Sequence, residues 1–263
     1  MEESDRARLR EAVDLLENIH WVATLANTIG MPIEWGVNRL PSKAREAITD
    51  ATVKAMRFAL RGALRTINKA ITRSPSNWWH KVGVSITGGV GGFFGITAVL
   101  VELPISTAIM LRSIADIARS EGEDLTQIDT QLACLEVFAL GGPRTADDSS
   151  KSGYYAVRIA LGRAVTEAAD YIVERGVAEE GAPVLVRLMT KLAARFDVVV
   201  TEKIAAEMIP VIGAVGGAGI NFLFLNHFQS MARGHFIVKQ LERKYGRDEI
   251  QNQYTALAGE HKH

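Results

Sequence analysis

Apolar positions recur with helical spacing along nearly the whole of this chain. No run alternates polar and apolar residues with a period of two over more than a few positions, so the pattern predicts essentially no β-sheet. The predicted helices span residues 4–29, 42–73, 84–101, 105–121, 127–140, 152–178, 183–208, 211–245 and 247–258. Stop signals separate them, among them Gly30, Ser74-Pro75-Ser76, Gly141-Gly142-Pro143 and Gly181-Ala182-Pro183. The sequence therefore predicts an all-α fold.

Two long stretches of this pattern, Val82–Val101 and Met208–Ala232, carry no Lys, Arg, Asp or Glu. Both are rich in glycines, which include Gly88, Gly91, Gly92, Gly95, Gly213, Gly216 and Gly217. Glycines spaced by four remove the side chains from one stripe of a helix and let another backbone approach closely. Since each glycine costs an isolated helix about 1 kcal/mol relative to alanine, close packing must compensate for them. We expect a single multi-helix bundle built around these two helices, packed against each other.

An ionisable residue stands at the corresponding position of each region: Glu102 directly follows the first stretch, and His227 lies 125 positions later within the second. A buried carboxylate needs a partner, so helices packed in register would favour a hydrogen bond between Glu102 and His227. The same pair could instead serve acid/base chemistry in a hydrolase or a lipid-modifying enzyme. His235 lies two helical turns after His227, so Glu102, His227 and His235 are also candidates for a metal site.

A basic amphipathic helix precedes the first stretch. Between Thr52 and Val101 there is no Asp or Glu, whereas the basic residues are Lys54, Arg57, Arg61, Arg65, Lys69, Arg73 and Lys81. Trp78 and Trp79 stand directly before the apolar stretch, and Trp and Lys are the side chains that a lipid headgroup boundary favours. We expect these residues to contact an anionic membrane surface or a membrane protein. The alternative is a solvated basic face that is balanced by acidic patches elsewhere.

The composition limits the remaining possibilities. The chain has 263 residues and a formal net charge of zero, so no nucleic acid partner is expected. Its single cysteine, Cys134, fits a reducing compartment and is expected to be a small buried hydrophobe. The amino terminus is acidic and amphipathic, which argues against a secretory signal peptide. We expect a cytoplasmic protein, and the basic helix suggests a peripheral position at the inner face of the cytoplasmic membrane.

No linker divides the chain, so we expect one domain. We divide it into a helical segment that packs on the core (1–40), a main helical domain (41–246) and a polar tail (247–263). There is no phosphate-binding loop, no His-Glu-x-x-His, no Gly-x-Ser-x-Gly and no Cys-x-x-Cys. The glycines from 213 to 219 follow a helix and a proline rather than a strand, so they do not predict a dinucleotide site. The sequence favours a protein without catalytic activity or cofactor.

A series of dispersed motifs resembles the EcsC family. They are Glu102-Leu103-Pro104, Met110-Leu111-Arg112-Ser113-Ile114-Ala115, Cys134-Leu135-Glu136-Val137-Phe138-Ala139-Leu140-Gly141-Gly142, Gly153-Tyr154-Tyr155-Ala156-Val157-Arg158, Ile209-Pro210-Val211-Ile212-Gly213 and Ala232-Arg233-Gly234-His235-Phe236. They occur in this order over roughly residues 45–245. The resemblance implies a bacterial helical protein, in a family named for a component encoded with an ABC transporter. It supplies no catalytic residues. It supports a helical fold and membrane association, and it adds little on mechanism.

Overall fold

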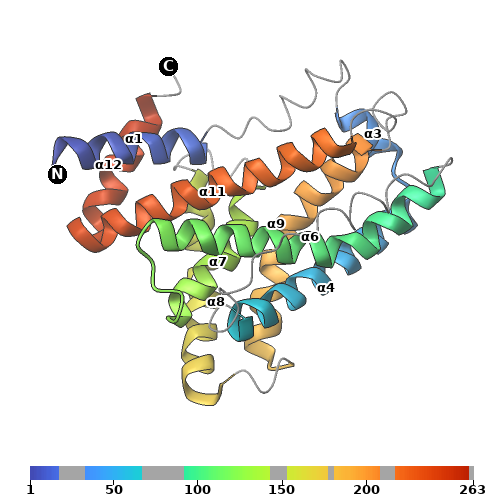
Figure 1. Ribbon diagram of the computed structural model, residues 1–263, viewed down its shortest axis with the longest axis horizontal. Coiled ribbons are helices and arrows are strands. Elements are labelled where there is room, and N and C mark those ends of the chain that lie inside the picture. The colour runs from blue at the N-terminus through green and yellow to red at the C-terminus, as the bar shows by residue number, and fades with distance from the viewer. Residues whose placement is uncertain (18–32, 67–91, 143–152, 177–180, 208–216, 261–263) are drawn as a thin grey trace.

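The computed structural model describes residues 1–17, 33–66, 92–142, 153–176, 181–207 and 217–260 (Figure 1). In this part of the chain all regular secondary structure is helical. The helices are α1 (Glu3–Glu17), α3 (Ile33–Arg39), α4 (Ser42–Thr66), α6 (Gly92–Ser120), α7 (Ile128–Leu140), α8 (Gly153–Arg175), α9 (Pro183–Glu207), α11 (Gly217–Tyr245) and α12 (Arg247–Glu260). The predicted all-α fold is confirmed.

Two sequence predictions are wrong. No helix is predicted between residues 29 and 42, but α3 spans Ile33–Arg39. The second error is a helix boundary inside α6. The sequence predicts a break between residues 101 and 105, but α6 runs without interruption from Gly92 to Ser120 and contains Pro104. Proline cannot donate to the carbonyl four residues earlier, which weakens a helix locally. The buried Leu103, Thr107 and Met110 lie on one side of α6 next to this point, so tertiary packing of that side supports the helix around Pro104.

Helix α6 lies between α4 and α11 in one layer and contacts both (Figure 1). The side-chain amide of Gln229 donates to the hydroxyl of Ser113 at 2.7 Å, which joins α11 to α6. The two helices that carry the uncharged stretches therefore pack against each other. Gly88, Gly91, Gly213 and Gly216 lie outside the described residues, and the surroundings of Gly92, Gly95 and Gly217 are not described. A glycine-to-glycine contact therefore stays a prediction.

The helix that is buried on all sides is α7. Every residue from Thr130 to Leu140 is buried, and α7 is contacted by α4, α6, α8, α9 and α11. An apolar sequence around the whole circumference is typical of such a central helix. Phe138 of α7 packs against Phe196 of α9 and Phe228 of α11, with ring centroids 5.0 and 5.6 Å away. Cys134 is buried in the same helix, and burial raises the pKa of its thiol to about 12.

Helices α1 and α12 lie together at the end of the bundle where α11 ends (Figure 1). Asp5 of α1 accepts hydrogen bonds from Lys244 and Tyr245 of α11, both at 2.7 Å. Leu16 packs so closely over Gly234 that a Cβ there would lie 2.6 Å from its Cγ. These contacts attach the amino-terminal helix to the main bundle.

Candidate functional site

The exposed side of α4 carries three basic residues in its C-terminal half. Lys54, Arg57 and Arg61 are spaced by three and four, so they follow one stripe of the helix. The opposite side carries the fully buried residues Ala55 and Met56. We call Lys54, Arg57 and Arg61 the basic face. Arg65 lies in α4, but its side-chain surroundings are not described, and Lys69, Arg73, Trp78, Trp79 and Lys81 lie outside the described residues.

A large apolar side chain lies beside this face. Phe58, between Arg57 and Arg61 in the sequence, is 47% exposed. Glu46 and Asp50 occupy the same stripe one to two turns nearer the start of α4, so positive charge is confined to its second half. The sequence analysis did not single out Phe58. The only indication in the sequence is that one aromatic residue stands among the charged positions of this helix.

The imidazole of His227 contacts the end of the central helix. Its Nε2 lies 3.0 Å from the carbonyl oxygen of Gly141, and Arg195 of α9 donates from Nε to the carbonyl of Ala139 at 3.1 Å. The last carbonyls of a helix have no partner within it, so these two side chains cap α7. Burial lowers the pKa of His227 to about 4, although the Gly141 contact opposes the shift, so the neutral ring donates its Nε2 proton to Gly141.

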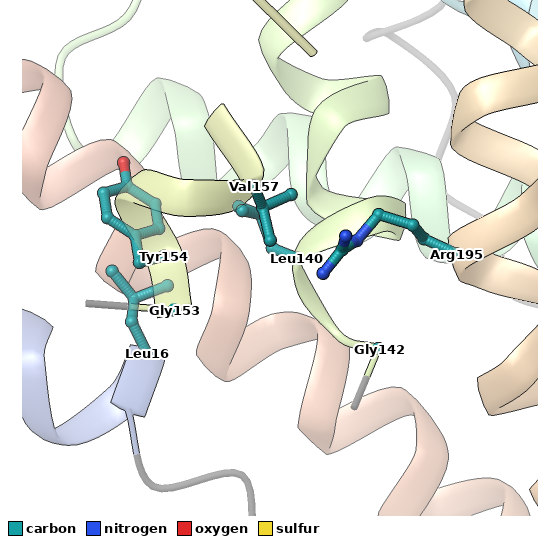
Figure 2. A pocket seen from close by; sticks show the side chains of 7 residues that line it. All are labelled: Leu16, Leu140, Gly142, Gly153, Tyr154, Val157 and Arg195. Atoms are coloured by element: carbon teal, nitrogen blue, oxygen red, sulfur yellow. The ribbon is translucent and has the colours of Figure 1, made fainter. Parts of the chain in front are cut away.

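Figure 2 shows Arg195 reaching toward Leu140 and Gly142 at this end of α7. The cavity beside them has a volume of about 10 Å³, and Tyr154 of α8 and Leu16 of α1 are among its lining residues. A space of this size holds one water molecule at most. This cavity therefore has no room for an organic substrate.

The predicted pairing of Glu102 with His227 is not tested. Glu102 lies in α6, but the structure does not describe what its side chain contacts. The structure shows instead that Nε2 of His227 is engaged by a backbone carbonyl. Among the described residues, no three His, Cys, Asp or Glu side chains are close enough together to hold a metal ion.

His235 belongs to a different group of buried side chains. Its Nδ1 lies 2.9 Å from the hydroxyl of Tyr154, and its Nε2 lies 4.0 Å from a carboxylate oxygen of Glu136. Burial lowers the pKa of His235 well below its usual value, and the nearby positive charges of Arg158 and Lys239 lower it further. Burial also raises the pKa of Glu136. The histidine therefore stays uncharged in the folded protein.

An ion pair completes this group, which sequence reasoning did not find. Arg158 of α8 donates two hydrogen bonds to the carboxylate of Glu242 of α11, at 2.6 and 2.9 Å, and Tyr155 donates a third at 2.9 Å. The Arg158 and Glu242 side chains are only 12% and 11% exposed. Two features of the sequence could have indicated this group. Tyr154 and Arg158 are four residues apart and so share one side of a helix, and Glu136 is a charged residue inside an apolar run. The arrangement satisfies buried polar groups and links α7, α8 and α11.

A larger groove of about 400 Å³ lies between α3, α4 and α9. It is lined by Ile33, Val37, Asn38, Arg45, Asp197, Val198, Thr201 and Glu202. Asp197 accepts a hydrogen bond from Thr49 at 3.1 Å, and burial raises the pKa of its carboxyl group. These contacts tie α9 to α4.

The comparisons with known proteins confirm the resemblance that the sequence motifs indicate. The sequence model of the EcsC protein family matches residues 8–241, and this range reaches from α1 to α11. No curated protein and no solved structure matches the chain. None of the helices in the described part of the chain combines the length and the apolar character that crossing a membrane requires.

Proposed function

We propose that this chain, which belongs to the EcsC protein family, binds the surface of anionic membranes peripherally through the basic face of α4. We propose further that it acts there as a non-catalytic accessory protein beside an ABC transporter or other membrane machinery. The observation that supports the first proposal is the exposure of Lys54, Arg57 and Arg61 on a helix whose opposite side is fixed in the core.

The energetics of such a contact are favourable. Each basic residue near an anionic lipid surface contributes about 1 kcal/mol, so Lys54 and Arg57 together contribute about 2 kcal/mol, or roughly thirtyfold in partitioning. Since Ala55 and Met56 already hold α4 in the bundle, the basic face does not have to be ordered when it binds. Among the described residues, neither Lys54 nor Arg57 has an ion-pair partner that binding would have to displace.

The competing explanation is that the basic face of α4 is simply exposed to water and only stabilises its own helix. Acidic Glu46 and Asp50 lie nearer the start of the helix and the basic residues nearer its end, an order that the helix dipole favours by itself. This explanation predicts no interaction with lipid.

Vesicle flotation distinguishes the two. The full chain would be mixed with vesicles of phosphatidylcholine alone, or of phosphatidylcholine with one-third phosphatidylglycerol, in low and high salt. We expect recovery with the anionic vesicles only. Raising the salt from 0.1 to 1 M shortens the Debye length from about 10 to about 3 Å, so it should release the protein. Equal recovery on both vesicles, or recovery that salt leaves unchanged, would contradict the proposal.

A further inference from the structure

Three large apolar side chains are exposed on the layer formed by α4, α6 and α11. They are Phe58 on α4 at 47% exposure, Ile105 on α6 at 37% and Phe222 on α11 at 67%. We call them the apolar triad. Each helix of the layer contributes one of them. Single exposed apolar residues are ordinary, whereas a group of them on one surface marks an interaction site.

Ile105 and Phe222 lie at the same level of two neighbouring helices. The Ser113–Gln229 hydrogen bond fixes the register of α6 against α11, and Figure 1 shows that the two helices run in the same direction. Ile105 precedes Ser113 by eight residues, and Phe222 precedes Gln229 by seven. Both therefore lie two turns, or about 11 Å, back along the helices and near the same side as the Ser113–Gln229 contact. They flank the solvent-exposed edge of the α6–α11 interface.

Phe58 lies on the side of α4 that faces α6. A Cβ added at Gly62, one turn later, would lie 3.5 Å from the Leu111 side chain of α6, and residues four apart share one side of a helix. Phe58 therefore stands between the basic face and the edge that α4 shares with α6. The apolar triad and the basic face are thus parts of one continuous surface.

The charges on the exposed side of α6 extend the same surface. Arg112 and Arg119 are exposed there, and the carboxylate of Asp116 lies 3.5 Å from Arg119. Apolar side chains among basic residues are typical of proteins that enter the interfacial region of an anionic bilayer, where the rings leave water and the cations remain at the phosphates.

We infer that the apolar triad inserts into the headgroup region of an anionic membrane, so that the α4–α6–α11 layer is the membrane-facing surface of the protein. This inference rests on the proposed function and adds the orientation of the bound protein. The occupant is lipid because the triad is continuous with the basic face, whose charge complements an anionic bilayer. A second copy of the chain on the same surface is an outcome that the experiment detects.

Site-specific labelling tests the orientation. Cys134, the chain's only cysteine, is buried, so a thiol-reactive NBD fluorophore will label an introduced surface cysteine selectively. Ile105→Cys and Phe222→Cys place the probe on the triad. Val173→Cys is the matched control, because Val173 is 72% exposed and lies near the end of α8, a helix that extends away from the layer toward the bottom of Figure 1.

We expect the emission of both triad probes to shift to the blue on phosphatidylglycerol-containing vesicles and to be quenched by nitroxide-labelled lipid, while the Val173 probe responds to neither. Flotation without these changes, or with an equal response at Val173, would overturn the inference and leave the proposed function standing. A blue shift that follows protein concentration without vesicles would assign the surface to a second copy instead. Absence of flotation would overturn both proposals.

Removal of the rings gives a second readout. Phe58→Ala/Phe222→Ala should lower vesicle partitioning roughly tenfold or more, since burying a phenylalanine side chain is worth more than the free energy of a tenfold change. The salt dependence should remain, because the basic face is intact. Unchanged partitioning of this double variant would overturn the inference.

Discussion

The Nε2 atom of His227 lies 3.0 Å from the carbonyl oxygen of Gly141, eighty-six residues earlier in the chain. The contact brings α11 against the carboxyl end of the central helix α7, where Arg195 from α9 donates to the carbonyl of Ala139. Two side chains from different helices thus satisfy carbonyls that α7 itself leaves unpaired. The histidine that lies within the second uncharged stretch has, in this contact, a role in the core of the fold.

The close approach at Gly141 predicts the effect of adding one methyl group. A Cβ at this position would lie 2.7 Å from Nε2 of His227 and 2.8 Å from the ring of Phe228. Gly141→Ala should therefore lower the free energy of unfolding by about 2 kcal/mol, since overpacking a core costs 1–3 kcal/mol. Urea denaturation measures the change.

Gly162→Ala is the matched control. Gly162 lies inside α8, and nothing lies within 4 Å of a Cβ added there. Alanine should be neutral or stabilise this helix by up to about 1 kcal/mol. If the two alanine variants unfold at the same urea concentration, the His227–Gly141 contact is not as close as described.

The buried histidines predict a loss of stability in mild acid. Burial lowers the pKa of His227 from 6.5 to about 4, so between these values the unfolded chain binds a proton that the folded protein excludes. The resulting stability is complete above pH 6.5 and is lost as the pH falls toward 4. For His227 alone the loss between pH 7 and pH 5 is about 2 kcal/mol.

Comparison with His227→Gln isolates this contribution. Glutamine retains a donor for Gly141 but does not titrate, so the variant should lose less stability than the wild type between pH 7 and pH 5. His235 adds to the loss in both proteins, whereas the raised pKa of Glu136 acts in the opposite direction in both. Parallel pH profiles for wild type and variant would contradict a neutral, buried His227. Urea titrations at each pH provide the measurement.

The Arg158–Glu242 pair predicts a large cost for removing one partner. Arg158→Met leaves a carboxylate that is 11% exposed without its cation, and such a loss typically costs 3–5 kcal/mol, with about 3 kcal/mol expected here because Tyr155 still donates to Glu242. Arg163→Met is the control, since Arg163 pairs with Glu167 in solvent at 85% side-chain exposure and should show no measurable change. Equal midpoints in urea for the two variants would exclude a structural role for the buried pair.

The burial of Cys134 predicts slow thiol chemistry. Its pKa of about 12, raised by burial, leaves almost no thiolate at neutral pH. An aromatic disulfide reagent should therefore modify the thiol only as fast as the protein unfolds, and urea should accelerate the reaction. Rapid modification of the native protein would contradict the enclosed position of α7.

Local sequence signals were sufficient to predict most helices. Gly181-Ala182-Pro183 marks the start of α9, which begins at Pro183 and ends at Glu207, one residue before its predicted end. Pro104 misled the prediction, because the packing of Leu103, Thr107 and Met110 on one side of α6 outweighs the hydrogen bond that proline removes. The central position of α7 was not predicted, although its apolar sequence all round was visible.

The basic face was predictable because its spacing lies within one helix. The partners of His227 and Arg158 were not, since Gly141 and Glu242 lie 86 and 84 residues away in the sequence and meet them only through helix packing. The exposure of Phe58 was also not predictable, because one aromatic residue among charged positions does not change the helical pattern of α4.

Charge reversal tests the proposed membrane contact most directly. Partitioning onto phosphatidylglycerol-containing vesicles would be measured for the wild type, for Lys54→Glu/Arg57→Glu, and for Arg6→Glu/Arg10→Glu, which makes the same charge change at exposed positions of α1. We predict at least a tenfold loss for the α4 variant, from about 2 kcal/mol of lost attraction, and a small change for the α1 variant. Equal partitioning of the two variants would contradict the assignment of the basic face of α4 as the membrane-binding surface.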